Sequence, residues 1–343
     1  MTQPATVAVD VGGTKIRAGS VIDGVLAHVR SAPTPATAGA RAVLDTIAEV
    51  AAAVIAESSG SRGAESLAES EWRIGIGAAG VIDPETCTVV SATDSLPGWA
   101  GTELASELSA RTDLPVRAVN DVHAHALGEA VTGASRGARS SLLVAAGTGI
   151  GGGFITNGHL LTGRNSAAGH IGHVPSAAAA RLDCPCGGTG HVEAIASGPA
   201  ILNTYQRLVH GDDSPASAPT SAPNSRSGRD GTAPIPANTR ELAAAASAGD
   251  ALAVRAFETG ARALGSALGG IVNVLSPEVI VVGGGLAEMD ETWWTPLRAA
   301  FAAELIPAAS GTPLVKAELG QDAALIGAAS LWNGEHSQKK ETH

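Results

Sequence analysis

Residues 6–30 read TVAVDVGGTKIRAGSVIDGVLAHVR, and residues 142–162 read LLVAAGTGIGGGFITNGHLLT. In each stretch an apolar run meets a Gly-Thr turn, and two extended runs then flank an Asp-Gly or Asn-Gly pair. Such a pair between extended runs is typical of a type I′ hairpin. The corresponding turns lie 134 residues apart in the two stretches. This common spacing predicts an internal duplication, while two unrelated hairpins in a glycine-rich chain are the simpler alternative.

The rest of the chain alternates between expected helices and strands, which favours an α/β fold. Helices are expected at 39–57, 102–111, 239–275 and 322–332, and strands at 72–77, 116–119 and 279–282. Residues 211–238 contain five prolines among small polar residues, so we expect a disordered insertion there. The polar residues 334–343 are expected to form a disordered tail.

Composition narrows the class of protein. A chain of 343 residues is long enough for two domains. Its formal net charge of −11 argues against a nucleic-acid partner, which would require a basic face. We find neither a signal peptide nor an apolar stretch long enough for a membrane span. Three cysteines cannot form a disulfide framework, so we expect a cytoplasmic protein.

Three glycine clusters each follow an apolar strand, and their sequences are Gly12-Gly13-Thr14-Lys15, Gly147-Thr148-Gly149-Ile150-Gly151-Gly152 and Gly283-Gly284-Gly285. Glycine allows backbone N–H groups to approach an anion closely, so the clusters predict phosphate binding, although tight turns alone would also use glycine. The chain contains no P-loop sequence. The second cluster matches Gly-x-Gly-x-x-Gly, but the residues after it are expected to form a strand instead of the helix that a dinucleotide site requires.

Asp10 ends the first expected strand, beside the first glycine cluster. A carboxylate at this place could hold Mg²⁺ directly or through water. The alternative is an aspartate that caps the turn.

Together these segments resemble the ROK family of sugar kinases and repressors, within the actin-like, two-lobed ATPase superfamily. The resemblance runs from Val7 to about Trp332 and rests on several motifs, which are DVGGTK at 10–15, LPGW at 96–99, Asn120-Asp121, GTGIGGG at 147–153, GHIGH at 169–173 and CPCGGTGHVE at 184–193. It implies that sugar binds in a cleft between two α/β lobes and that ATP is held by the two hairpin loops and by Gly283–Gly285. Only nine residues precede Asp10, so we expect a kinase rather than a repressor.

The resemblance assigns catalysis to Asp121 as the base that accepts the sugar hydroxyl proton, with Asn120 as a sugar ligand. Read without the family, Asn-Asp at a strand–helix junction is usually a helix cap. Asp121 and His125 also have the i,i+4 spacing of metal ligands, although ordinary helix histidines are the simpler interpretation.

The resemblance places further residues against the sugar, and these are Gly80, Thr93, His173 and Glu193. Many family members have Glu at the position of His170, and a neutral imidazole can donate a hydrogen bond as well as accept one. The segment with His170 looks like that of bacterial N-acetylmannosamine kinases. We therefore expect phosphorylation of the 6-hydroxyl of N-acetylmannosamine, with a glucokinase or N-acetylglucosamine kinase as the alternative.

A compact set of zinc ligands is predicted at His173, Cys184, Cys186 and His191. Two thiolates and two imidazoles suit tetrahedral Zn²⁺, and a closed site with four protein ligands is structural. Family members usually have Cys at the position of His191, so the fourth ligand here is a departure. A reduced thiol loop without metal is the alternative.

We expect an N-terminal lobe at residues 1–119, with a C-terminal helix at about 321–333 packed back on it, and a C-terminal lobe at 120–320 that carries the zinc loop. The expected ligands are ATP, Mg²⁺, structural Zn²⁺ and a small-molecule sugar. The resemblance also implies a homodimer.

Overall fold

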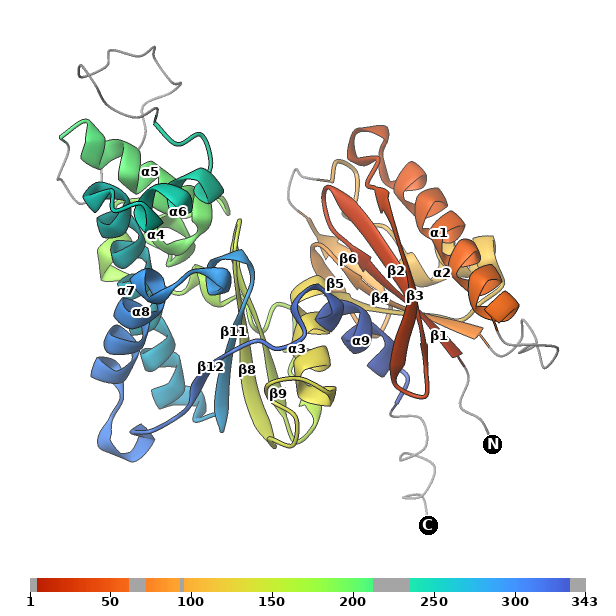
Figure 1. The fold of residues 1–343 in the computed structure, drawn as a ribbon. Coiled ribbons are helices and arrows are strands. Elements are labelled where there is room, and N and C mark those ends of the chain that lie inside the picture. The colour runs from red at the N-terminus through yellow and green to blue at the C-terminus, as the bar shows by residue number, and fades with distance from the viewer. Residues whose placement is uncertain (1–4, 62–71, 93–95, 212–234, 334–343) are drawn as a thin grey trace. The chain divides into compact units, whose positions relative to one another are not determined.

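The computed structural model describes residues 5–61, 72–92, 96–211 and 235–333. Contacts within the chain divide it into two compact units (Figure 1). The first unit comprises residues 1–143, 152–169 and 317–343, and the second comprises 144–151 and 170–316. This division assigns residues 120–143, 152–169 and 317–320 to the first unit, whereas the sequence placed 120–320 in the second lobe.

Two five-stranded sheets share one strand order, and this repeats the duplication seen in the sequence. The first sheet runs β3-β2-β1-β4-β7 and the second runs β10-β9-β8-β11-β12. Their strands are β1 Ala5–Val11, β2 Lys15–Ile22, β3 Val25–Pro33, β4 Trp72–Ala78, β7 Val116–Asn120, β8 Ser140–Ala146, β9 Ile150–Thr156, β10 His159–Leu160, β11 Val279–Gly283 and β12 Leu314–Lys316.

The two predicted hairpin turns have nearly the same backbone conformation. Asp23 and Gly24 have φ values of 50° and 79°, and Asn157 and Gly158 have 50° and 77°. Positive φ at both central residues is the requirement of a type I′ turn, and it explains the Asp-Gly and Asn-Gly sequences. The α/β fold with duplicated strand, glycine loop and hairpin is therefore confirmed.

In the first unit, side chains of β1 alternate between two apolar cores. Val7 and Val9 belong to a core that includes residues of α1 (Ala40–Ser61) and α2 (Leu104–Thr112). Ala8 belongs to a second core shared with α3 (Asp121–Val131) and α9 (Ala323–Ser330). The period of two along a strand thus explains why helices cover both faces of the sheet.

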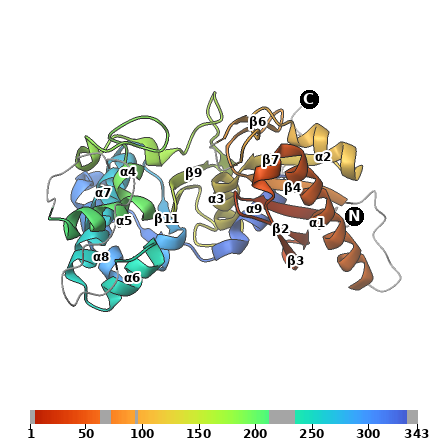
Figure 2. The same ribbon diagram turned by 90° about the horizontal axis from the view of Figure 1, so that it is seen from above.

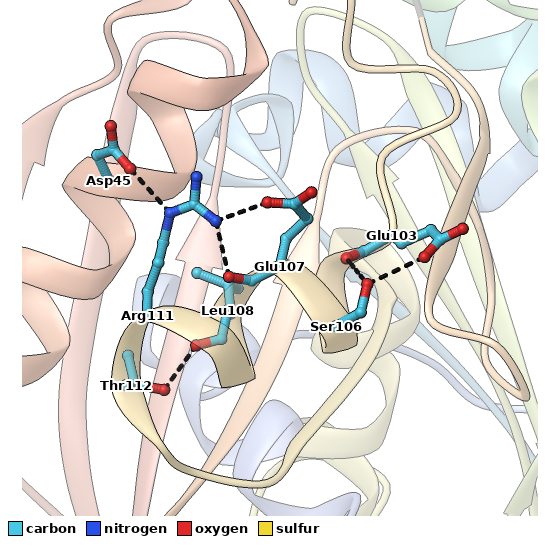
Figure 3. A network of polar contacts seen from close by, with 7 residues as sticks. All are labelled: Asp45, Glu103, Ser106, Glu107, Leu108, Arg111 and Thr112. Carbon is cyan, nitrogen blue, oxygen red and sulfur yellow. Dashed lines mark hydrogen bonds and ion pairs between the residues drawn. The ribbon is translucent and has the colours of Figure 1, made fainter.

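Polar contacts join α2 to α1 at the edge of the first core (Figure 3). The Arg111 guanidinium of α2 donates to Asp45 of α1 over 2.8 Å and to the Glu107 carboxylate over 2.6 Å. Such exposed ion pairs contribute about 0–1 kcal/mol each. The apolar contacts of Leu104 and Leu108, both fully buried, therefore hold α2 in place.

Glycine brings α9 into backbone contact with α3, and Figures 1 and 2 both show the two helices side by side. A Cβ on Gly327 of α9 would overlap the carbonyl of Ala124 of α3, and a Cβ on Gly128 of α3 would overlap the carbonyl of Ala323. A Cβ on Gly75 of β4 would overlap the carbonyl of Ala328 in the same way. The C-terminal helix is thus fixed against both the sheet and α3.

The second unit contains α4 (Glu193–Ala196), α5 (Gly198–Val209), α6 (Thr239–Ser247), α7 (Ala251–Leu275) and α8 (Glu291–Glu304). The helical region predicted over 239–275 consists of two separate helices, α6 and α7. Gly249 has a φ of 93°, which ends α6, and the Asp250 side chain caps α7 by accepting from the N–H groups of Leu252 and Ala253. Sequence analysis also missed α5, α8, β12 and the hairpin of β5 (Val81–Asp83) and β6 (Thr88–Ser91).

Several sequence predictions fall on residues that the structure does not describe. These are Thr93, the tail at 334–343 and most of the insertion predicted at 211–238. Among the helices of the described residues, none has a stretch long and apolar enough to cross a membrane.

The contact between α3 and α9 generates a stability prediction. Gly327→Ala forces the two backbones apart, so we expect it to lower the free energy of unfolding by about 3 kcal/mol. The matched control is Gly270→Ala on the exposed side of α7, where a Cβ would meet nothing within 4 Å. That change is expected to stabilise the protein by about 0.5–1 kcal/mol, as alanine is the better helix former. Urea unfolding of both variants measures the difference, and equal stabilities would contradict the packing described here.

Candidate functional site

Three parallel strands of the first unit bring the predicted residues to one edge of the sheet. Asp10 of β1 is in register with Gly77 of β4, and Ala78 of β4 is in register with Asn120 of β7. Carboxyl ends of parallel strands are where open α/β sheets bind ligands. Asp10 therefore meets Asn120 and Asp121 at a candidate site, although it is more than a hundred residues from them in the sequence.

Gly80 belongs to the same edge. Its φ is 107°, and a Cβ there would lie 2.6 Å from the Ser91 carbonyl oxygen, so only glycine fits. The indole N–H of buried Trp99 donates to the Ala79 carbonyl over 3.0 Å and anchors the adjoining segment. The LPGW motif thus supports the turn that contains Gly80.

Asn120 is the N-cap of α3. Its Oδ1 accepts from the N–H groups of Val122 and His123, and its Nδ2 donates to the Gly80 carbonyl and to Asp121 Oδ1, both over 2.8 Å. These four contacts use the hydrogen-bonding capacity of an amide side chain. A sugar hydroxyl could bind Asn120 only in exchange for one of them.

Asp121 and Asp10 are carboxyl groups in a shared, poorly solvated place. Burial raises the pKa of Asp121, against hydrogen bonds from the Val122 N–H and from Asn120, which lower it. Burial, and then the neighbouring charge of Asp121, raise the pKa of Asp10 to about 6. Two carboxyl groups with raised pKa values at the end of parallel strands suit proton transfer and cation binding.

The first glycine loop leads out of this edge. The Gly12 N–H donates to the Lys15 carbonyl over 3.0 Å, and the Thr34 hydroxyl donates to the Gly12 carbonyl over 2.7 Å. Gly13 is half-buried, while Thr14 and Lys15 are exposed. The exposed N–H groups and ammonium group of such a closed turn can hold phosphate oxygens.

Sequence analysis missed the partner that holds Lys15. Gln321 accepts from the Lys15 ammonium over 3.4 Å, and Asp322 accepts from Arg17 over 2.8 Å. These residues come directly before α9 and are 306 and 305 positions from their partners. No sequence signal connects them, because the contact depends on the packing of α9.

His125 lies on α3 one turn after Asp121. Its Nε2 is buried and has no hydrogen-bond partner within the described residues, and partial burial lowers the pKa of the ring. The metal-binding groups of the described residues do not include His125, so the i,i+4 pattern with Asp121 forms no metal cluster there.

The second unit brings the other two glycine clusters together. A Cβ on Gly147 would lie 3.8 Å from the backbone nitrogen of Gly285, and a Cβ on Gly284 would overlap the Ala146 carbonyl. Gly283 ends buried strand β11, whereas Thr148 and Gly285 are exposed. The two loops therefore form one backbone surface in this unit, with N–H groups available to an anion.

Glu193, the first residue of α4, contacts the turn between β8 and β9. Its Oε2 accepts from the Ile150 N–H over 2.7 Å, and a Cβ on Gly149 would lie 2.8 Å from that same oxygen. Its Oε1 lies 4.0 Å from the Cys184 sulfur. The sequence predicted a carboxylate with two oxygens for sugar hydroxyls, and the structure commits one of them to the backbone of the second glycine loop.

The four predicted zinc ligands form one cluster. The candidate ligand atoms of His173, Cys184, Cys186 and His191 all lie within 4.8 Å of one another. Cys184 Sγ is 3.6 Å from His173 Nδ1, and Cys186 Sγ is 3.2 Å from His191 Nδ1. Two sulfurs and two imidazole nitrogens at these separations fit a tetrahedral zinc ion.

The protonation of these groups affects metal binding. Burial lowers the pKa of His173, so its imidazole is neutral at pH 7 and can bind a metal. Burial raises the pKa of the Cys184 thiol to about 11, so a metal must displace its proton.

His170 and His173 lie on one short segment that packs against the second glycine loop. Their rings stack with centroids 6.2 Å apart. A Cβ on Gly172 between them would overlap the Ile150 carbonyl, so glycine allows the segment to rest on the start of β9.

Comparison with known proteins identifies relatives along nearly the whole chain. The model of the ROK family matches residues 6–335. A glucokinase of Halalkalibacterium halodurans is 33% identical over 95% of this chain and 94% of its own length. An N-acetylmannosamine kinase of Escherichia coli is 30% identical over 96% and 99% of the two chains.

A solved structure is similar as well. The ROK family glucokinase of Streptomyces griseus, crystallised in complex with glucose and AMPPNP, has a TM-score of 0.72 and 30% sequence identity. The match covers 95% of this chain and 98% of that one.

The cysteine and histidine cluster predicts about one zinc ion per chain in purified protein. Cys186→Ser should lower the zinc content well below one, because a hydroxyl is a poor zinc ligand. Cys87→Ala is the matched control, since Cys87 lies in the apolar core of the first unit. Elemental analysis measures the metal, and full zinc content in the Cys186 variant would contradict the proposed ligand set.

Proposed function

The chain belongs to the ROK family, which has the two-lobed actin-like ATPase fold, and from that premise we propose that it is an ATP-dependent carbohydrate kinase. It transfers the γ-phosphoryl group of ATP to the 6-hydroxyl of a hexose or N-acetylhexosamine. The relatives named as a glucokinase and an N-acetylmannosamine kinase match 95% and 96% of the chain.

The observation that carries this proposal is the half-buried Asp121 carboxylate near Asp10 at the carboxyl ends of β7 and β1. A sugar hydroxyl is a weak nucleophile at neutral pH, so a carboxylate must orient it and accept its proton. Burial raises the pKa of Asp121 and makes it a stronger base than an exposed aspartate. Asn120 holds this carboxylate by a 2.8 Å hydrogen bond.

The phosphate groups of ATP are assigned to the glycine loops. Gly12, Gly13, Thr14 and Lys15 in the first unit, and Gly147, Thr148, Gly149, Gly283, Gly284 and Gly285 in the second, supply backbone N–H groups and one ammonium group. Asp10 is the residue that would hold Mg²⁺. The ion, when bound, neutralises charge on the phosphate oxygens during transfer.

The sugar is assigned to Gly80, Thr93, Asn120, His170, His173 and Glu193. Asn120 would bind a sugar hydroxyl by exchanging one of its four hydrogen bonds within the protein. N-acetylmannosamine is the proposed substrate because His170 offers a donor as well as an acceptor near the substituents of C1 and C2. Glucose is the second candidate, and the 33% identity to a glucokinase favours it. Both substrates use the same base and the same phosphate loops.

Zinc at His173, Cys184, Cys186 and His191 would have a structural role, since four protein ligands leave no open position. His173 then joins the metal to the sugar, with Nδ1 toward the cysteine sulfur. A homodimer remains a prediction of the family resemblance, and a cytoplasmic location remains a prediction from the cysteine content and the N-terminal sequence.

The role of Asp121 is tested by Asp121→Asn. An amide keeps the size of the side chain but cannot take a proton, so we expect kcat to fall by roughly 10²–10⁴ while sugar affinity changes only several-fold. Only the ionised form of Asp121 acts as a base, and its pKa is raised above the ordinary value of 3.8. In the parent enzyme, kcat/KM should therefore fall as the pH drops through this raised pKa. A coupled ADP-release assay measures both, and turnover within tenfold of the parent would exclude Asp121 as the base.

The substrate is tested by a panel of glucose, mannose, fructose, glucosamine, mannosamine and their N-acetyl forms. We expect the highest kcat/KM with N-acetylmannosamine. His170→Glu removes the donor and should shift the ratio of kcat/KM values toward glucose, mainly by loss of the N-acetylmannosamine activity, by at least tenfold. Faster turnover of glucose by the parent enzyme would reject the substrate assignment and leave the kinase assignment standing.

A further inference from the structure

The backbone of Ile150 lies between two parts of the second unit that the proposed function assigns to different substrates. It directly follows Gly147–Gly149, the glycine loop assigned to ATP. Its N–H donates to Glu193 over 2.7 Å, and its carbonyl lies against Gly172, between the histidines assigned to the sugar. The two backbone polar groups of this one residue therefore contact the segments assigned to the sugar and follow the loop assigned to the nucleotide.

The two oxygens of the Glu193 carboxylate contact different segments of the second unit. Oε2 accepts from the Ile150 N–H, and Oε1 lies 4.0 Å from the sulfur of Cys184, one of the four candidate zinc ligands. A hydrogen bond from a backbone N–H to a carboxylate is among the stronger ones in proteins. The first residue of α4 is thus tied to the loop 43 positions earlier in the chain.

The loop itself has few other fixed points among the contacts of the described residues. The Gly147 N–H donates to the Gly149 carbonyl over 2.9 Å, and the Gly198 N–H donates to the Gly147 carbonyl over 2.8 Å. Gly198 begins α5, directly after α4, so both outer anchors of the loop come from the segment that Glu193 opens. Glycines at 147 and 149 leave the backbone conformationally free, so external hydrogen bonds must define the direction of its N–H groups.

We propose that Glu193 is a positioning residue for nucleotide binding: by holding the Ile150 N–H it orients the Gly147–Gly149 loop for the phosphates of ATP, in addition to its assigned contact with the sugar. This inference rests on the proposed kinase function. It differs from a role in sugar binding alone, which would leave nucleotide affinity without sugar unchanged.

Two substitutions separate the roles. Glu193→Gln keeps an oxygen that can accept from Ile150 but removes the negative charge, whereas Glu193→Ala removes the acceptor. The probe is ADP with Mg²⁺, titrated by calorimetry without any sugar. We expect Glu193→Ala to weaken ADP binding roughly tenfold, the loss of one hydrogen bond to a charged group, and Glu193→Gln to stay within about threefold of the parent.

Gly149→Ala is an independent variant in which residue 193 is still glutamate. A Cβ there would lie 2.8 Å from Oε2, so the carboxylate must move off the Ile150 N–H. We expect it to weaken sugar binding as well as ADP binding, although residue 149 is assigned only to the nucleotide.

Amide hydrogen exchange in peptides that contain Ile150 reports the contact directly. Exchange should accelerate in Glu193→Ala and remain as in the parent in Glu193→Gln, and this readout needs no activity. Zinc content and melting temperature, measured on each variant, show whether the segment remains folded; a variant that fails to fold is replaced by Gly149→Ala in the comparison.

The outcomes are distinct. The positioning role would be overturned if Glu193→Ala bound ADP within twofold of the parent and amide exchange at Ile150 were unchanged. The kinase assignment would then remain intact. Equal weakening in Glu193→Gln and Glu193→Ala would also overturn it, because charge and not the hydrogen bond would then matter. A parent protein that does not bind Mg²⁺ and ADP at all would overturn the proposed function itself.

Discussion

Backbone lies directly against backbone at the positions that hold this site together, and that constraint requires glycine. The carbonyl of Ala124 occupies the place where a Cβ on Gly327 would be, so α9 fixes the helix that begins with Asp121. The Ala146 carbonyl does the same at Gly284, where the loops of the second unit meet. Contacts of this kind tolerate almost no displacement, since a side chain cannot adjust its rotamer to relieve them.

Because of this packing, the strands and the helix that carry Asp10 and Asp121 have fixed positions in the first unit. Asp10 and Asp121 lie at the ends of parallel strands, and burial raises the pKa values of both. The amide group of Asn120 forms hydrogen bonds with the start of α3 and with the carbonyl of Gly80. Folding thus places two carboxyl groups in a poorly solvated position, an unfavourable arrangement that a bound cation would relieve.

In the first unit the ends of strands position the candidate residues, whereas in the second unit a side chain, Glu193, makes the connecting contacts. Glu193 connects the glycine loop to the cysteine and histidine cluster, and a metal in that cluster would stiffen the same segment. The sequence departures at His170 and His191 both lie in this part.

The sequence by itself determined the features that depend on neighbours in the chain. The Asp-Gly and Asn-Gly turns require positive φ wherever they occur, and the histidines and cysteines of 173–191 are close enough in sequence to surround one ion. Motifs of this length also identified the family. The break at Gly249 was equally local but was hidden by the alanine-rich sequence on both sides.

Only the tertiary structure decided which distant groups meet. It brought Gln321 to Lys15 across 306 positions, joined Glu193 to Ile150, and directed the amide nitrogen of Asn120 to the carbonyl of Gly80. These contacts follow from how helices and strands pack. A local pattern fixes the conformation of a few residues, whereas packing sums many weak contacts over the whole chain, and no short stretch of sequence contains that sum.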